Sequence, residues 1–457
     1  MNDKIESMPQ PTGTNGGFSS LVSAQGVDLD QLEPLQTQVQ MWTTEAGTGV
    51  KFVETRGLPI VDVVLRFKAG TTQDTEQPGL AALTLYMLDE GSRRHTAARQ
   101  AAGMERLGAI LEKQIRLEHA TLSLRSVSTK TILEPALDLL TDLVANPAFL
   151  APALEKVKRQ LVQHNASREQ RPRLRARSEA FRHLFQGHPY GNPLGSTIQG
   201  VAAVSPEDLR AFHQRAYSAS NLEIVLVGDL ALSEAQAIAQ QISQALPQGW
   251  SAVDLPAVPV ATQATINVEQ PGTSSAVLLA LPMNVAASDP DFPALVLASE
   301  VLGSGLESRL MVELRQRRGL TYDIYSRPSP LSSGGLFTIE WEIAPQYVQG
   351  SQDRVAALLR DFIEQGPTQA ELQLARKQLA GQLLRGVAQN NSLAALLTEM
   401  TQQRQPADHL NTYIERIGRL SPADIRAVMQ RWLDLDYKVQ VSVGPRVEQQ
   451  PLPAITP

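Results

Sequence analysis

The chain has 457 residues, more than the roughly 250 to 300 at which a single hydrophobic core stops growing, so we expect at least two domains. Hydrophobic residues make up 42% and charged residues 19%, and no apolar run reaches the roughly 18 residues typical of a membrane-spanning helix. A formal net charge of -6 argues against nucleic acid as a partner, and the lack of cysteine excludes disulfides, thiolate zinc ligands and a cysteine nucleophile.

The first segment, residues 1–40, is predicted to be a flexible N-terminal arm, because it is polar and shows no hydrophobic periodicity. It lacks the basic start and the apolar core of a secretory signal, so we expect no export signal in the sequence as written. A sequence from which an export signal had been removed would lack the same features. The compartment therefore stays open between the cytoplasm and the periplasm.

The first folded elements are predicted between residues 61 and 128. VDVVLRFKAG, residues 61–70, and TLSLRSVS, residues 121–128, show the alternating, β-branched pattern of strands. Between them GLAALTLYMLDEG, residues 79–91, is apolar at helical spacing and carries its first charge only three residues from its end. We assign the apolar side chains near the end of this helix to packing: Leu85, Met87 and Leu88.

The chain contains an internal repeat. VSPEDLRAFHQRAYSASNLEIVLVGD, residues 204–229, aligns without gaps with LSPADIRAVMQRWLDLDYKVQVSVGP, residues 420–445, an offset of 216 from 204 to 420. Each copy predicts a Ser N-cap, Pro at the first helical position, an amphipathic helix and a strand that ends at Gly. LEKVKRQL, residues 154–161, matches LQLARKQL, residues 372–379, in the same order. We infer two similar domains related by duplication.

These patterns predict an α+β fold of two homologous α/β-sandwich domains. The second domain should open with the strand AVLLALPMN, residues 276–284, and contain a later strand LFTIEWEI, residues 336–343. Three prolines make the stretch between the domains a stiff connector. The predicted boundaries are an arm over 1–40, an N-terminal domain over 41–245, a connector over 246–272, a C-terminal domain over 273–446 and a tail over 447–457.

A late segment, GSGLESRLMVELRQRRGLTYDIYS, residues 303–326, predicts a helix over 307–317 followed by a strand that begins near residue 322. The chain resembles the pitrilysin/insulinase family of zinc peptidases in two sets of motifs. The first is FKAG, eight intervening residues and GLA; the second is SRL, LR, GL and Y in this late segment. The similarity is greatest to two-domain members that pair as dimers, namely mitochondrial processing peptidase and its bacterial relatives. The resemblance covers nearly everything after the arm.

In active members of that family, a helix after the first strand carries H-x-x-E-H, whose histidines bind zinc and whose glutamate is the base. The corresponding positions here are Ala82, Leu85 and Tyr86. Alanine and leucine offer no lone pair, and tyrosine is not a usual zinc ligand. The family's third ligand falls near His164, for which we predict a structural or solvated role. We therefore expect no metal in this chain, with Tyr86 filling the vacated volume.

The resemblance also implies a substrate clamp in the second domain. Active members use an arginine and a tyrosine seven residues apart to hold the substrate backbone and to stabilise the oxyanion, and the matching residues here are Arg315 and Tyr322. Arg318 is the alternative if the register is shifted. Spacing alone also fits a second interpretation, in which Arg315 is a solvated helix charge and Tyr322 belongs to the core.

Taken together, the resemblance implies a noncatalytic subunit of a heterodimeric zinc peptidase. Its partner would be a homologous zinc-bearing subunit, and its substrate an extended peptide or unfolded protein that adds a strand to an exposed sheet edge. The chain alone should hydrolyse nothing. The alternative is a binding or structural protein of the same fold, in which Arg315 and Tyr322 are vestigial. The missing ligands argue against a self-sufficient zinc peptidase.

Overall fold

The computed structural model describes residues 35–74 and 77–455. Most of the predicted arm, residues 1–34, lies outside the described residues. Residues just before the first strand are not free, because the backbone N–H of Thr37 donates to the Asn411 amide oxygen at 2.9 Å and its carbonyl accepts from the same amide at 2.9 Å. Within the described part of the chain, every helix is too short or too polar to cross a bilayer.

The first half contains a six-stranded sheet with the strand order β1-β2-β6-β3-β5-β4. β6 is parallel to β2 and antiparallel to β3, and β5 is antiparallel to both β3 and β4. The strands are β1 (Gln40–Thr43), β2 (Gly49–Glu54), β3 (Ile60–Phe67), β4 (Ile110–Ile115), β5 (Ala120–Val127) and β6 (Leu222–Gly228).

The second half contains a five-stranded sheet that repeats this pattern without β1. Its order β7-β11-β8-β10-β9 matches β2-β6-β3-β5-β4, and β11 is again parallel to one neighbour and antiparallel to the other. β7 lies inside the range 246–272 that the sequence predicted as a connector, so the last part of that range belongs to a sheet. The strands are β7 (Ala264–Glu269), β8 (Ser275–Pro282), β9 (Ile324–Leu331), β10 (Gly334–Ile343) and β11 (Val439–Gly444).

Helices cover one face of each sheet and form two separate hydrophobic cores. The helices of the first half are α1 (Leu80–Met87), α2 (Ala97–Arg106), α3 (Lys130–Ala145), α4 (Ala151–Glu169), α5 (Pro172–Leu184), α6 (Ile198–Ala203), α7 (Pro206–Ala216) and α8 (Leu232–Ala245). The helices of the second half are α9 (Phe292–Gly303), α10 (Arg309–Met311), α11 (Val348–Gln365), α12 (Gln369–Val387), α13 (Asn390–Gln402), α14 (His409–Arg419) and α15 (Pro422–Trp432). Of these, α5 and α13 contribute to neither core.

The repeated segments fold alike, down to their hydrogen bonds. Ser205 caps α7 by accepting from the Asp208 N–H at 3.2 Å, and Ser421 caps α15 by accepting from the Asp424 N–H at 3.2 Å. In both copies the aspartate returns a bond to the serine N–H, and the following strand ends at glycine. The predicted fold class of two homologous α/β-sandwich domains related by duplication is confirmed.

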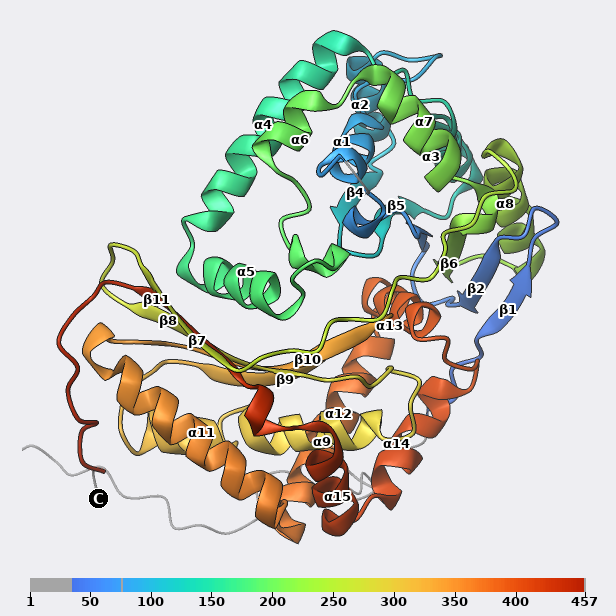
Figure 1. Ribbon diagram of the computed structural model, residues 1–457. Coiled ribbons are helices and arrows are strands. Elements are labelled where there is room, and N and C mark those ends of the chain that lie inside the picture. Colours follow the sequence, from blue (N-terminus) through green and yellow to red (C-terminus); the bar gives the residue numbers. More distant parts are fainter. Residues whose placement is uncertain (1–34, 75–76, 456–457) are drawn as a thin grey trace, which may run out of the picture. The chain divides into compact units, whose positions relative to one another are not determined.

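The two halves exchange one helix each. α5 of the first half packs on β8 and β11 of the second sheet, whereas α13 of the second half packs on β3 and β6 of the first sheet (Figure 1). The apolar side chains of each helix close a further cluster with the sheet that it covers. Each sheet is thereby covered on one face by its own helices and on the other by a helix from the other half.

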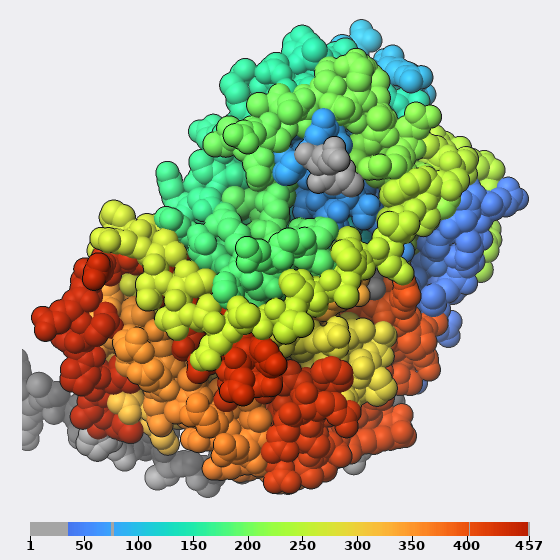
Figure 2. All heavy atoms as spheres, viewed as in Figure 1, coloured from blue at the N-terminus to red at the C-terminus, as the bar shows by residue number. Residues whose placement is uncertain are grey.

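The chain between the two halves runs over the surface. In Figure 2, the yellow-green stretch around residue 250 lies along the boundary between the green first half and the orange second half. The C-terminal segment is also attached, because the Gln450 N–H donates to the Gln346 carbonyl at 2.8 Å and Arg318 donates to the Pro453 carbonyl at 2.7 Å. Neither segment has a core of its own.

Candidate functional site

The helix at the position of the family's zinc helix is α1, and it lies in the first core. Gly79 takes a left-handed conformation (φ 118°) at its start, where glycine is the residue without a steric penalty. The Asp74 carboxylate accepts from the N–H groups of Gly79 at 2.8 Å and Ala81 at 2.6 Å, which satisfies donors that a helix start leaves open. Burial raises the pKa of Asp74 to about 7, although the two N–H donors favour the ionised form.

The side chains at the three chemical positions cannot bind zinc. Ala82 and Leu85 are buried in the apolar core, and Tyr86 is packed against it. Lys113 lies over the Tyr86 ring, with its Nζ 5.7 Å from the ring centroid, and burial raises the pKa of the phenol. His164 is exposed on α4. In the part of the chain that the structure describes, no group of three or more His, Asp or Glu side chains could hold a metal.

Two buried histidines elsewhere in the first half, His188 and His213, make structural hydrogen bonds instead. His213 contacts the Val144 carbonyl through Nε2 at 2.6 Å, and burial lowers the pKa of His213 to about 4, so that it stays neutral. His188 contacts the Pro256 carbonyl through Nε2 at 3.0 Å and accepts from the Tyr190 N–H at 3.1 Å. Neither ring keeps both nitrogens free for other chemistry.

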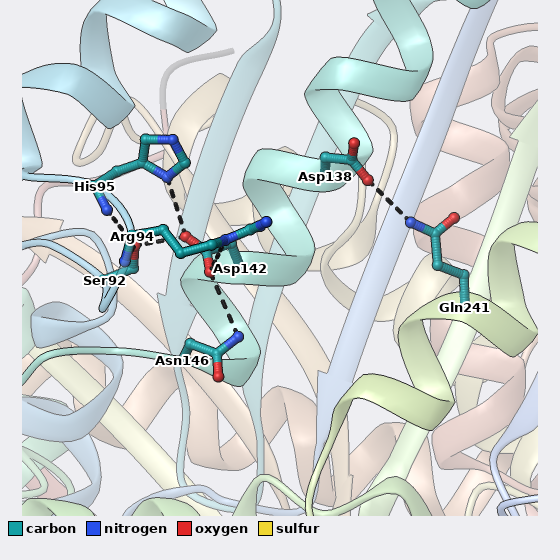
Figure 3. Close-up of polar contacts among 7 residues, drawn as sticks. All are labelled: Ser92, Arg94, His95, Asp138, Asp142, Asn146 and Gln241. Atoms are coloured by element: carbon teal, nitrogen blue, oxygen red, sulfur yellow. Dashed lines mark hydrogen bonds and ion pairs between the residues drawn. The ribbon is translucent and has the colours of Figure 1, made fainter.

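Ser92, His95 and Asp142 gather between the start of α2 and the end of α3 (Figure 3). The Ser92 hydroxyl donates to Asp142 at 2.5 Å rather than to His95, which contacts the same carboxylate at 3.2 Å. Burial raises the pKa of Asp142, but the bonds from Ser92, Arg94 and His95 outweigh it and leave the pKa lowered. The serine therefore has no base, and the cluster fastens a turn to α3.

The structure brings Arg315 and Tyr322 together at the end of an irregular helix. α10 is only three residues long, and a π-helical turn, Val312–Gln316, follows it. Such turns occur often at functional sites. Arg315 donates from Nη1 to the Tyr322 carbonyl at 2.8 Å. The strand β9 begins two residues later than predicted, at Ile324.

The two candidate arginines differ in whether their side chains are free to bind a ligand. The Tyr322 side chain is not in the core, because the residue is 89% exposed, and the Arg315 side chain is exposed as well. Arg318, the alternative arginine, is committed to Glu313 at 3.0 Å and to the chain near its C-terminal end. Arg315 is therefore the arginine that can reach a ligand beside Tyr322.

A cavity of about 1630 Å³ lies between the two halves, and neither Arg315 nor Tyr322 is among the residues that line it. One edge strand of each sheet, β4 of the first and β9 of the second, contributes to its wall. The motifs of the sequence analysis place no residue at this cavity. The sequence does contain a basic stretch, residues 168–177, from which Arg168 and Arg177 line the wall while Arg173 and Arg177 pair with carboxylates of β10.

Two family models match successive parts of the chain. The family model described as Insulinase (Peptidase family M16) matches residues 52–198, and the model described as Peptidase M16 inactive domain matches residues 203–379. A relative named non-peptidase homolog YmxG, from Helicobacter pylori, is 28% identical over 74% of this chain and 78% of its own length. An uncharacterized zinc protease of Mycobacterium leprae is 23% identical over 82% of this chain and 84% of its own length.

Solved structures agree with the fold. A crystal structure described as a peptidase M16 inactive domain, from Pseudomonas fluorescens, superposes with a TM-score of 0.87 at 35% identity, covering 91% of this chain and 100% of its own. A protease from Helicobacter pylori superposes with a TM-score of 0.81 at 17% identity, covering 90% of this chain and 100% of its own. At that identity the second match supports the fold alone.

Proposed function

Because the chain belongs to the insulinase (M16) peptidase family and its first domain lacks the zinc ligands, we propose that it is the noncatalytic subunit of a heterodimeric zinc peptidase. The observation that carries this proposal is the contrast between α1 and the late segment. α1 has apolar residues where the metal chemistry would be, whereas Arg315 and Tyr322 stand side by side at an exposed π-helical turn. The chain is an M16-family protein without a catalytic centre of its own.

In this proposal Arg315 and Tyr322 act on a substrate that another chain cleaves. A guanidinium keeps its charge and offers forked donors to a carbonyl, and a phenol adds one directed donor. The Arg315 bond to the Tyr322 carbonyl uses only Nη1 and fixes the side chain beside the tyrosine. Enclosure by the partner would remove water from a tyrosine that is 89% exposed in the single chain and strengthen both hydrogen bonds.

The peptide would add to the open edge of β4. Among the described strands β4 pairs only with β5; it contains no proline and lines the cavity, so its outer N–H and C=O groups can bind an extended chain. β9 occupies the corresponding edge of the second sheet but carries Pro328 and Pro330, which have no N–H to donate. Of the two edges, β4 is the one suited to strand addition.

The partner would be a homologous chain with an intact H-x-x-E-H helix, whose first domain faces the second domain of this chain. That partner would hold the zinc and supply the general base. This chain would supply the clamp and part of the enclosing wall. The domain boundaries of the sequence analysis remain part of the proposal, with the connector ending before β7.

The test is reconstitution with such a partner, encoded by a neighbouring gene or recovered by pull-down. The mixture should cleave an unfolded peptide while each chain alone does not. Arg315→Ala in the complex should lower kcat about 100-fold with little change in complex formation, as for removal of one oxyanion donor. Arg317→Ala is the matched control, because Arg317 is an exposed neighbour that pairs only weakly with Glu313 at 3.7 Å.

The alternative, a binding or structural protein of the same fold, is favoured by one observation. Neither clamp residue lines the cavity, so nothing in the single chain ties the pair to a bound peptide. Unchanged turnover of the Arg315→Ala complex would support this alternative. Stoichiometric zinc and hydrolysis by the isolated chain would exclude both.

A further inference from the structure

The wall of the cavity between the two halves has the opposite charge balance from the chain as a whole. The chain has 41 Lys and Arg residues against 47 Asp and Glu, whereas the wall has eight against six. Three of the wall arginines are neutralised by nearby carboxylates, in the pairs Arg66 with Glu223, Arg125 with Asp62 and Arg177 with Glu340. The remaining cations decide what the wall attracts.

Five wall cations form no ion pair among the residues that the structure describes. They come from both halves, so each half contributes cations to the wall. Four wall carboxylates lie outside the three pairs. Glu118 is hydrogen bonded to Tyr190, and Glu399 interacts electrostatically with Arg116 and Arg327 without forming an ion pair. The five cations are Lys68, Arg116, Arg168, Arg327 and Arg404.

Arg168 is the one of these five cations whose pKa is lowered by burial. It lies half-buried in the last turn of α4, close enough to Tyr86 for the two to interact electrostatically. Burial outweighs the attraction of the neighbouring Glu169, so part of the desolvation cost of this guanidinium remains uncompensated. An anionic group in the cavity would offset that cost.

Arg404 provides an independent observation from the other half. It follows α13 in the left-handed conformation (φ 52°), at the position where helices usually end in glycine. The Gln405 N–H donates to the Met400 carbonyl at 2.8 Å and the Arg404 N–H donates to the Thr401 carbonyl at 3.1 Å, which completes this helix-ending motif. Glycine would fit the backbone better, so an arginine here is retained at a conformational cost.

We propose that the cavity binds peptide segments rich in carboxylates, with Arg168 and Arg404 as contacts from opposite halves. This inference rests on the proposed function, according to which the ligand is a peptide. What it adds is the charge of that peptide. Carboxylates pair with guanidinium groups through two parallel hydrogen bonds, which gives such a peptide a defined place on the wall. The open edge of β4 lies in the same wall.

The test is fluorescence anisotropy of the isolated full chain with matched labelled peptides: a Glu-containing sequence, its Gln counterpart and its Lys counterpart, each with a free or amidated C-terminus. The Glu peptide should bind about tenfold more tightly than the Gln peptide, and the difference should shrink as NaCl is raised. If the amidated and free forms of the Glu peptide bind equally, the side-chain carboxylates are responsible for the preference. If amidation weakens binding, the C-terminal carboxylate is responsible. Equal binding of the Glu and Gln peptides overturns the proposal.

Two variants locate the effect. Arg168→Gln and Arg404→Gly should each weaken binding of the Glu peptide several-fold and leave the Gln peptide unchanged, and Arg404→Gly should do so with an unchanged or higher Tm. Arg106→Gln is the matched control, because Arg106 is an exposed arginine of α2 that is not part of this wall. Unchanged Glu-peptide binding in folded Arg168→Gln and Arg404→Gly overturns the proposal.

The outcome is separable from that of the proposed function. Charge-selective binding needs neither a partner nor Arg315, so it can succeed when Arg315→Ala leaves turnover unchanged, and it can fail when Arg315→Ala abolishes turnover. A single-stranded oligonucleotide of equal charge serves as a competitor. Displacement of the Glu peptide by the oligonucleotide at equal concentration would assign the wall to general polyanion binding and overturn the peptide proposal.

Discussion

The two exchanged helices cover equivalent sheets by different means. α5 meets the second sheet with apolar residues and with ion pairs, among them Arg173 with Glu342 at 2.9 Å and Arg177 with Glu340 at 2.6 Å. α13 meets the first sheet mainly through apolar side chains such as Leu397. Two hydrogen bonds lie at the margin of this contact: Lys51 donates to the Thr401 hydroxyl, and the Thr55 hydroxyl donates to the Asn390 amide oxygen. Duplication therefore preserved where the helices lie but not what holds them, and the two contacts should respond differently to salt.

The apolar contact should be the more sensitive to lost volume. Leu397→Ala removes a fully buried side chain between α13 and the valines of β3 and β6, and it should lower the free energy of unfolding by about 2–4 kcal/mol. Urea titration followed by circular dichroism measures this change. Leu58→Ala is the control, since Leu58 is 62% exposed. Equal losses in both variants would contradict the assignment of Leu397 to the contact.

The halves also differ in their response to acid. His213 of α7 is buried and neutral, and 216 residues later α15 carries the buried residue Met429. The pKa of His213 is lowered to about 4 from 6.5, so the unfolded chain binds a proton first and stability is lost as pH falls from about 6.5 towards 4.

His213→Met should abolish this loss, which is on the order of 3 kcal/mol at the lowest pH. Unfolding measured at a series of pH values gives the difference between wild type and variant. At neutral pH the variant also loses the bond to the Val144 carbonyl, so the informative quantity is the slope with pH rather than the value at one pH. An unchanged slope would place the acid sensitivity in another group.

The charged contact should show coupling that salt reduces. A double-mutant cycle of Arg177→Gln and Glu340→Gln should give a coupling of about 1 kcal/mol, discounted because the Arg177 side chain is 45% exposed. The coupling should fall in 1 M NaCl, where screening acts within about 3 Å, while the effect of Leu397→Ala should not. Equal salt dependence at both contacts would remove the distinction between them.

The repeat at residues 204–229 and 420–445 gave the duplication, the two serine caps and two central strands directly, because capping chemistry and strand patterning are local. β7 was missed because prolines around it indicated a connector, and its partner β11 lies far away in the sequence. The exchange of α5 and α13 depends on which sheet face remains open after each half folds. No local pattern contains that information.

The candidate site, like the fold, could be predicted only in part. The loss of donors at Ala82 and Leu85 could be read from residue types alone, and the adjacency of Arg315 and Tyr322 followed from their spacing. The direction of the Tyr322 phenol could not, because it depends on a π-helical turn and on a strand that begins later than predicted. The charge of the cavity wall was also hidden, since its five cations without an ion pair are far apart in the sequence and come from both halves.

Each half covers the sheet of the other half with one helix, and this arrangement suggests how the duplication arose. A polypeptide with only one of these units would leave a β-sheet face bare, and the simplest way to shield it is a second identical molecule that lends its own helix. Fusion of the two genes of such a symmetric homodimer would give the arrangement seen here. Proteolytic cleavage of the exposed connector between the halves should accordingly leave two fragments that stay together without a covalent link.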